Sequence, residues 1–243
     1  MHILVLGASS YVGAALAEAF SPNNGLILVG RDVDRLIMAT KICKNSGAAQ
    51  VAYIEQDLGQ GVSAVLQAIE GKRIDLVIDA ASASSRYRDT EIEPSDIPRY
   101  VYADFLSRTE IMDHVLRNQD SAPAMIFIST VLTLVKSPGR RIYTALKALN
   151  ETHLTKIKNS RPDFYLLIVY VGTVIDTRHE TRKPKTLASA VFQAFANKNE
   201  SLFFGLSGIF LLILFYLQPL LYYGVTVAQR RIRQLLGGSV RTR

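Results

Sequence analysis

The stretch HILVLGASSYVGAALAEAF, residues 2–20, decides the fold. Residues 3–6 are continuously apolar, as in a parallel strand that is covered on both faces. Gly7 interrupts the strand, and residues 14–20 are mostly good helix formers. We therefore expect a buried strand, a glycine turn and a helix, which together form the first unit of an α/β fold.

The same alternation continues along the chain. Further strands are expected at residues 26–30, 51–58, 73–82, 124–130 and 164–172. Helical patterns follow these strands and include residues 62–70, 100–116, 143–158 and 186–199, whereas the polar residues 84–99 are expected to form a loop. The sequence therefore predicts one domain of the α/β class, with a doubly wound, Rossmann-like parallel sheet.

The charge of the chain is concentrated at one end. The sequence has 28 basic and 21 acidic residues, and five of its arginines lie in the last fourteen positions, where there is no acid. Without those five, the balance is 23 against 21, which is nearly neutral. This is a near-neutral body with a basic tail, so we expect no nucleic-acid partner.

Cysteine and histidine usage limits the chemistry further. Cys43 is the only cysteine, so no internal disulfide can form. The four histidines have no metal-binding spacing, and we expect no metal site. The apolar run at residues 1–7 is too short for a signal peptide, so the body is expected in the cytoplasm.

The turn GASSYVG, residues 7–13, has the residues of a phosphate-binding loop. Gly7 permits a tight turn, Gly13 lets the helix lie close to the sheet, and the helix N-terminus offers N–H groups to a pyrophosphate. The usual middle glycine is replaced by Ser10 or Tyr11, so a plain strand–turn–helix is the alternative. The turn residues predicted to contact a dinucleotide are Gly7, Ser9, Ser10, Tyr11, Val12 and Gly13.

The end of the second strand indicates which dinucleotide is bound. Arg31 directly follows the strand, and an arginine there suits the 2′-phosphate of NADP(H). An acid at this strand end suits the 2′-hydroxyl of NAD(H), and Asp32 stands one position later. The sequence therefore favours NADP(H), with NAD(H) as the weaker alternative.

Three residues downstream complete a resemblance. Tyr143 stands four residues before Lys147, the only such pair in the chain, and Thr130 stands thirteen residues before Tyr143. Together with the glycine turn, these residues resemble the short-chain dehydrogenase/reductase family over residues 3–196. The resemblance implies that Thr130, Tyr143 and Lys147 are the catalytic residues.

The resemblance also implies cofactor contacts from three further strand ends. They are Asp57 and Leu58 beside the adenine, Ala80, Ala81 and Ser82 beneath the cofactor, and Gly172, Thr173 and Val174 at the nicotinamide.

Tyr143 and Lys147 should share one helix face, because residues at i and i+4 are neighbours on a helix. A nearby ammonium is expected to lower the pKa of the phenol, so that Tyr143 exchanges a proton with the substrate oxygen. The resemblance implies that both Tyr143 and Lys147 also contact the cofactor, Lys147 through the ribose hydroxyls. Thr130 would hold the substrate oxygen for hydride transfer.

The chain departs from the family pattern in several places. Residues 80–82 contain no asparagine, and the helix that usually carries a catalytic asparagine has Tyr102 or Asp104 at that position. These changes indicate a divergent member. They also keep a rival function open, a catalytically impaired NADP(H)-binding membrane scaffold or sensor.

The C-terminal segment is uncharged and mostly apolar. Residues 202–228 contain no charged side chain over 27 positions, and about 20 apolar residues suffice to cross a bilayer. A helix–break–helix that enters only the cytoplasmic leaflet keeps the basic residues on both sides in the cytoplasm, which favours it over a spanning helix. A buried core helix or a homodimer interface is the alternative. In the helix–break–helix arrangement, residues 201–204 could form a final strand of the sheet, ended by Gly205.

The sequence thus predicts three regions: an NADP(H)-binding domain over residues 1–200, a membrane-associated segment over 201–228 and a basic tail over 229–243. The expected function is a membrane-tethered NADP(H)-dependent oxidoreductase that acts on a hydrophobic or lipid-linked substrate. Residues 202–236 would contact membrane lipid, with the catalytic domain facing the cytoplasm. A nucleotide-sugar isomerase or dehydratase is disfavoured, because only about 25 residues lie between the sixth strand and the apolar run, which leaves no room for its larger substrate lobe.

Overall fold

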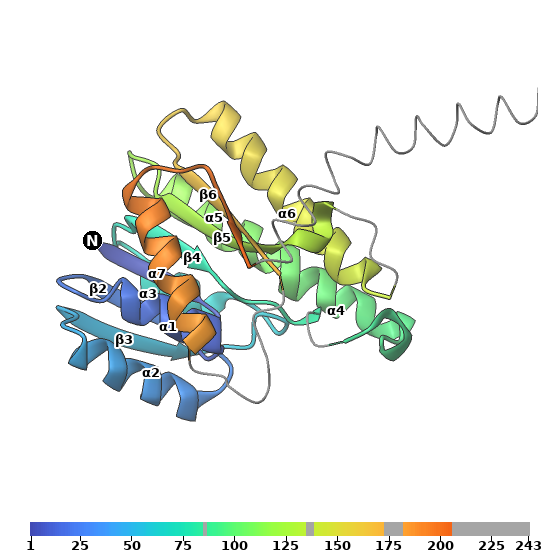
Figure 1. The fold of residues 1–243 in the computed structure, drawn as a ribbon, viewed down its shortest axis with the longest axis horizontal. Coiled ribbons are helices and arrows are strands. Elements are labelled where there is room, and N and C mark those ends of the chain that lie inside the picture. The colour runs from blue at the N-terminus through green and yellow to red at the C-terminus, as the bar shows by residue number, and fades with distance from the viewer. Residues whose placement is uncertain (85–86, 135–138, 173–181, 206–243) are drawn as a thin grey trace, which may run out of the picture.

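The computed structural model describes residues 1–84, 87–134, 139–172 and 182–205 (Figure 1). The predicted cofactor residues Thr173 and Val174 lie outside these ranges, as does the apolar segment from residue 206 onward. The predicted regions at 206–228 and 229–243 therefore stay predictions.

Seven strands form one parallel sheet in the order β3-β2-β1-β4-β5-β6-β7. They are β1 (His2–Leu6), β2 (Gly25–Gly30), β3 (Gln50–Glu55), β4 (Leu76–Asp79), β5 (Ala124–Thr130), β6 (Leu166–Val171) and β7 (Ser201–Phe204). The chain builds β2 and β3 on one side of β1 and then crosses to β4 on its other side. The order reverses between β1 and β4, which is where ligands bind in sheets of this kind.

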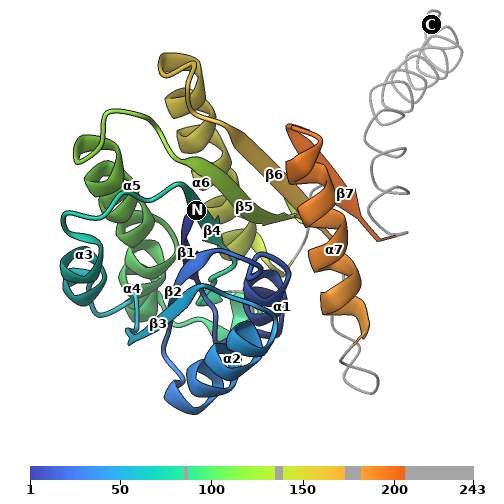
Figure 2. The ribbon, with the colours of Figure 1, turned by 90° about the vertical axis from the view of Figure 1, so that its left-hand side faces the viewer.

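Helices cover both faces of the sheet (Figures 1 and 2). One face carries α1 (Tyr11–Ala19), α2 (Val33–Asn45) and α7 (Arg182–Ala196). The other carries α3 (Ser63–Ile69), α5 (Ser107–Arg117) and α6 (Arg141–Ser160). The connections include α4 (Ile97–Val101), the π-helical turn η4 (Tyr102–Leu106) and the 3-10 turns η2 (Asp89–Glu91), η3 (Pro94–Asp96) and η5 (Val131–Leu134).

The sheet residues alternate between two cores. In β1, Ile3 and Val5 pack under α1, α2 and α7, whereas Leu4 and Leu6 pack under α3, α5 and α6. Because successive side chains of a strand point to opposite faces, a strand covered on both sides must be apolar throughout. The continuous apolar runs therefore predicted the covered sheet correctly, and the Rossmann-like fold is confirmed.

The structure corrects several predicted bounds. The fourth strand, expected over residues 73–82, is only β4, and residues 80–82 begin the turn that follows it, although the N–H of Ala80 still donates to the carbonyl oxygen of Leu6 at 3.0 Å. The loop expected over residues 84–99 contains η2, η3 and the start of α4, which has a proline in its first turn. The helix expected over 100–116 is α4, η4 and α5 in succession.

Residues 201–204 form β7, which pairs in parallel with β6. The final strand considered for residues 201–204 is therefore confirmed, and the boundary expected after residue 200 moves to the end of β7. Within the part of the chain that the structure describes, no helix combines the length and apolar character that crossing a bilayer requires.

Candidate active site

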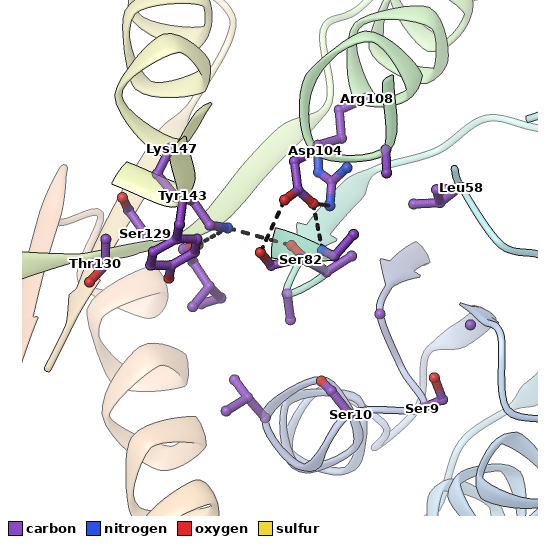
Figure 3. Close-up of a pocket in the computed structure, with 18 of the residues that line it drawn as sticks. Ser9, Ser10, Leu58, Ser82, Asp104, Arg108, Ser129, Thr130, Tyr143 and Lys147 are labelled. Carbon is purple, nitrogen blue, oxygen red and sulfur yellow. Dashed lines mark hydrogen bonds and ion pairs between the residues drawn. The ribbon is translucent and has the colours of Figure 1, made fainter. Parts of the chain in front are cut away.

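A cavity of about 860 Å³ opens at the carboxyl ends of the strands, where the strand order reverses. Its walls come from the turns after β1, β2 and β4 on one side, and from the end of β5 and the start of α6 on the other (Figure 3). A volume of this size is in the range of small-molecule and cofactor sites.

The turn after β1 lies so close to the sheet and to its own backbone that two positions require glycine. Gly7 has φ +82°, and a Cβ there would lie 2.7 Å from the Cα of Ala81. A Cβ on Gly13 would lie 2.2 Å from the carbonyl oxygen of Gly7. Ser10 caps α1 by accepting a hydrogen bond of 3.0 Å from the N–H of Gly13. The N-terminus of α1 thereby opens toward the cavity, ready for an anionic group.

The charged residues after β2 differ in their contacts. Asp32 caps α2 by accepting from the N–H of Arg35 at 3.1 Å, and it pairs with the Arg35 guanidinium at 3.3 Å. Arg35 also lies over the ring of Tyr11, 5.1 Å from its centroid. Arg31 is exposed and lines the cavity. The acid at this strand end is thus held by its own helix, whereas the arginine faces the site.

Asp57 and Leu58, predicted to lie beside the adenine, line the cavity after β3. The Asp57 carboxylate accepts from the N–H of Gly59 at 3.0 Å and pairs with Arg99 at 3.0 Å. Leu58 is buried. This edge of the cavity is therefore an apolar side chain next to a carboxylate that is already paired.

Thr130, Tyr143 and Lys147 come together on one wall of the cavity (Figure 3). Thr130 ends β5, and Tyr143 and Lys147 follow one another on the first turns of α6. The side chains of Thr130 and Tyr143 are hydrogen-bonded to each other. The three groups thus have the proximity that proton exchange with a shared substrate oxygen requires.

The predicted lowering of the Tyr143 pKa is wrong. Burial raises the pKa of Tyr143 to about 12, and it outweighs the opposing hydrogen bond from Thr130. The Lys147 ammonium donates to the carbonyl oxygens of Ile128 at 2.7 Å and of Ala81 at 3.5 Å. Desolvation disfavours the phenolate because it disfavours any charged form, so the phenol keeps its proton at neutral pH.

Of the two residues considered at the asparagine position, Asp104 faces the site. It is buried, lines the cavity and accepts hydrogen bonds from the backbone N–H groups of Ala83 and Ser84. The Tyr102 hydroxyl instead donates to Glu110 at 3.2 Å. The π-helical turn, in which both residues lie, aims Asp104 at the turn after β4.

The structure brings most of the predicted residues to this cavity. The cavity is lined by Gly7, Ser9, Ser10, Tyr11, Val12, Arg31, Asp57, Leu58, Ala80, Ala81, Ser82, Thr130, Tyr143, Lys147 and Gly172. Gly13 lies behind the turn and does not line it.

Sequence reasoning missed other lining residues, among them Arg35, Gln56, Ala83, Arg108, Ser129, Leu132 and Arg140. The helix cap at Asp32 could have identified Arg35, because a cap residue bonds the backbone N–H three positions later. The sequence did not predict that Arg108 lines the cavity, because a charged residue in an amphipathic helical pattern is expected on the exposed face.

Comparison with known proteins identifies the family. Residues 1–158 match the sequence profile of the short chain dehydrogenases. The chain belongs to the short chain dehydrogenase family.

One curated relative is the hydroxysteroid 11-beta-dehydrogenase 1-like protein A of Xenopus laevis, which is 23% identical over 193 residues. The alignment covers 75% of this chain and 66% of the relative, so the chain spans about two thirds of the length of that protein.

Solved structures share the fold. A short-chain dehydrogenase from Sphingobium yanoikuyae in complex with NADPH is 22% identical, with a TM-score of 0.73 over 99% of this chain and 96% of that one. An alcohol dehydrogenase from Comamonas testosteroni, specific for bulky-bulky ketones, is 20% identical, with a TM-score of 0.75 over 99% of this chain and 95% of that one. At these identities the likeness shows the fold.

Proposed function

We propose that this protein is an NADP(H)-dependent oxidoreductase that reduces a carbonyl group or oxidises the corresponding alcohol. The observation that carries the proposal is the joint placement of Thr130, Tyr143 and Lys147 on one wall of a cavity whose opposite wall is the glycine turn. The family match and the cofactor-bound relative support it.

The cofactor would supply the hydride, and this chain's residues would orient the reactants and move the proton. Thr130 would hold the substrate oxygen beside Tyr143. Because the raised pKa leaves the Tyr143 phenol protonated at neutral pH, it is ready to donate to a forming alkoxide. Lys147 would hold the ribose.

The charges after β2 support NADP(H) as the cofactor. Arg31 lies exposed at the cavity, whereas Asp32 is occupied by the cap of α2 and by Arg35. A 2′-phosphate would therefore meet a cation, and the acid that would favour a 2′-hydroxyl is already paired.

Replacing Arg31 tests this preference. We expect Arg31→Gln to raise the Kd for NADPH by about 10-fold to 100-fold, because a hydrogen bond to a charged group contributes about 1.5–3 kcal/mol. The Kd for NADH should hardly change. Cofactor-fluorescence titration measures both values. Lys41→Gln, which removes an exposed cation from α2 outside the cavity, is the matched control.

We further propose that the segment after β7 tethers the enzyme to a membrane, with the catalytic domain in the cytoplasm. Residues 206–228 continue the uncharged run beyond β7, and Arg230, Arg231 and Arg233 follow it. Such a tether would bring the cavity close to lipid, so the proposed substrate is hydrophobic or lipid-linked. Residues 206–236 would contact the lipid.

Vesicle flotation of the full chain tests the tether. Each arginine near an anionic surface contributes about 1 kcal/mol, so replacing Arg230, Arg231 and Arg233 by glutamine should weaken binding to anionic vesicles about 100-fold. Binding to neutral vesicles should stay unchanged. If the protein floats with neither kind of vesicle, the membrane tether is ruled out. The proposed oxidoreductase activity would not be affected by that result.

A further inference from the structure

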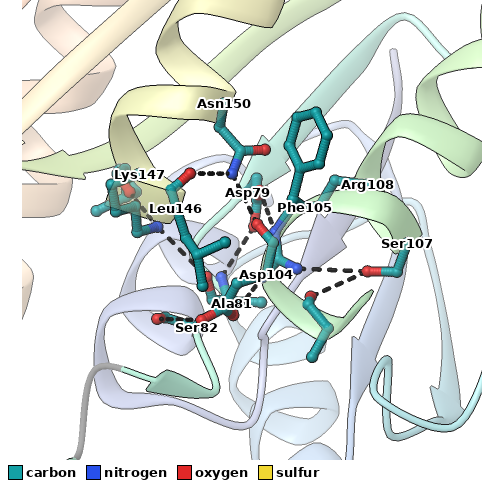
Figure 4. A network of polar contacts seen from close by, with 12 residues as sticks. Asp79, Ala81, Ser82, Asp104, Phe105, Ser107, Arg108, Leu146, Lys147 and Asn150 are labelled. Carbon is teal, nitrogen blue, oxygen red and sulfur yellow. Dashed lines mark hydrogen bonds and ion pairs between the residues drawn. The ribbon is translucent and has the colours of Figure 1, made fainter. Parts of the chain in front are cut away.

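Four charged side chains are buried together at the inner wall of the cavity, where Asp104, Arg108 and Lys147 line it and Asp79 lies beneath them (Figure 4). Their exposed fractions are 0% for Asp79, 5% for Asp104, 4% for Arg108 and 6% for Lys147. Burying an ion without a partner costs several kcal/mol, so such a group must be balanced and hydrogen-bonded. Two acids face two bases here, and the formal charges cancel.

Arg108 joins the two acids. Its Nε donates to Asp79 at 2.8 Å, and its Nη2 lies 3.5 Å from Asp104. Burial by itself raises the pKa of Asp104, but Arg108 and the hydrogen bonds from Ser84 and Ala83 outweigh it and hold the pKa below its usual value. Asp104 is therefore ionised at neutral pH, as the balance of charges requires.

The acids also hold the turn after β4. Asp79 accepts from the N–H of Ala81 at 3.0 Å. Asp104 accepts from Ala83 N at 2.7 Å through one oxygen and from Ser84 N at 2.9 Å through the other, and from the Ser84 hydroxyl. Both carboxylate oxygens thus receive backbone N–H groups. An asparagine could not replace this arrangement, because its amide would turn a donor toward one of them.

The same turn meets Lys147. The carbonyl oxygen of Ala81 accepts from the Lys147 ammonium at 3.5 Å. Asn150, one turn further along α6, donates to the carbonyl oxygen of Asp104 at 2.7 Å. Two residues of α6 therefore contact the network: Lys147 through its ammonium, and Asn150 through its hydrogen bond to the backbone of the π-helical turn.

We propose that Asp104 and Arg108 are positioning residues for Lys147: with Asp79 they balance its charge inside the protein and hold the turn at residues 81–84 on which its ammonium rests. The role of Lys147 in hydride transfer rests on the function proposed above. Asp104 thereby replaces the asparagine expected at this position with a charged group that forms an ion pair with Arg108.

The charges around Lys147 give this proposal a direction. Burial lowers the pKa of Lys147, Asp79 and Asp104 raise it, and Arg108 lowers it. Glu151, on α6 itself, also raises it. Removing Asp104 should therefore favour the neutral amine, and removing Arg108 should favour the ammonium.

The test titrates Lys147 by NMR in full-length protein carrying ¹³C-labelled lysine, with Lys147→Met to assign the signal. Asp104→Asn should move the titration to lower pH by about 1 unit, and Arg108→Met should move it to higher pH by about 1 unit. The double variant keeps Asp79 and Lys147 in balance, so its midpoint should return toward that of the wild type. Asp113→Asn, an exposed acid on α5, is the control.

Activity should follow the titration. The high-pH limit of kcat/KM should shift in opposite directions in the two single variants. Arg108→Lys, which keeps the charge, should leave that limit in place while it lowers the rate. The comparison of Arg108→Met with Arg108→Lys stands even where Asp104→Asn fails to fold, which thermal unfolding would show.

Two outcomes would overturn the proposal. In one, both single variants move the Lys147 midpoint in the same direction. In the other, neither moves it although activity falls, which is what a purely structural network would give. The NMR titration needs neither cofactor nor turnover. If the wild-type protein reduces no carbonyl compound, the proposed function is contradicted. The NMR titration would still test the role of Asp104 and Arg108.

Discussion

Tyr143→Phe should lower the rate of NADPH-dependent carbonyl reduction about 1,000-fold, within the range that general acid catalysis contributes. The phenol is the group that would give the alkoxide its proton, and the Thr130 hydroxyl with which it bonds cannot supply one as readily. The phenyl ring fills the same space, so the cavity keeps its shape. Steady-state NADPH oxidation with hydrophobic ketones measures the loss.

NADPH binding should survive the same change, because the glycine turn, Arg31 and Lys147 remain. Fluorescence titration of the variant should give a Kd within a few-fold of the wild type. Tyr53→Phe, which removes an exposed phenol from β3, controls for loss of a tyrosine as such. If the wild-type protein binds NADPH but reduces no ketone, the result would instead support the scaffold or sensor function.

Gly13→Ala should destabilise the fold by about 3 kcal/mol, at the upper end of what overpacking usually costs. The added Cβ would lie 2.2 Å from the Gly7 carbonyl oxygen and 2.8 Å from its carbon, and both are backbone atoms. The start of α1 must therefore move away from the strand end. Denaturant unfolding measures the loss of stability. Weaker NADPH binding should accompany it, because the helix N-terminus retreats from the phosphate position.

Ala14→Gly is the matched control for this prediction. It changes the neighbouring residue of α1 in the opposite sense and should cost about 1 kcal/mol through helix propensity alone. Its NADPH affinity should equal that of the wild type. An unfolding midpoint for Gly13→Ala at the wild-type value would mean that α1 has room at this point, against the close approach that the structure shows.

The sheet and its two layers followed from local patterns. Strands such as residues 3–6 are apolar at every position, which fits only a sheet covered on both faces. The strand ends were predicted less accurately, because residues 80–82 remain apolar or small beyond the end of β4. The local sequence does not show at which residue a strand stops pairing with the adjacent strand.

The predicted site depended on order and spacing. Thr130, Tyr143 and Lys147 could be grouped because a strand end and a helix start meet at the same edge of the sheet. The choice between Tyr102 and Asp104 could not be made, because η4 is a π-helical turn and shifts the faces that an α-helical count would assign. Arg108, the partner of Asp104, was missed because a charged residue in a helical pattern is expected to be exposed.

The sequence by itself determined the order of strands and helices, the glycine turn and the identity of the reactive side chains, because these depend on residue type and periodicity. Only the tertiary structure decided their electrostatics. Burial raises the pKa of Tyr143 against the expected direction, and Asp32 is bound within α2. Solvation and charge pairing depend on which groups from distant elements surround a side chain, and that is fixed only when the chain has folded.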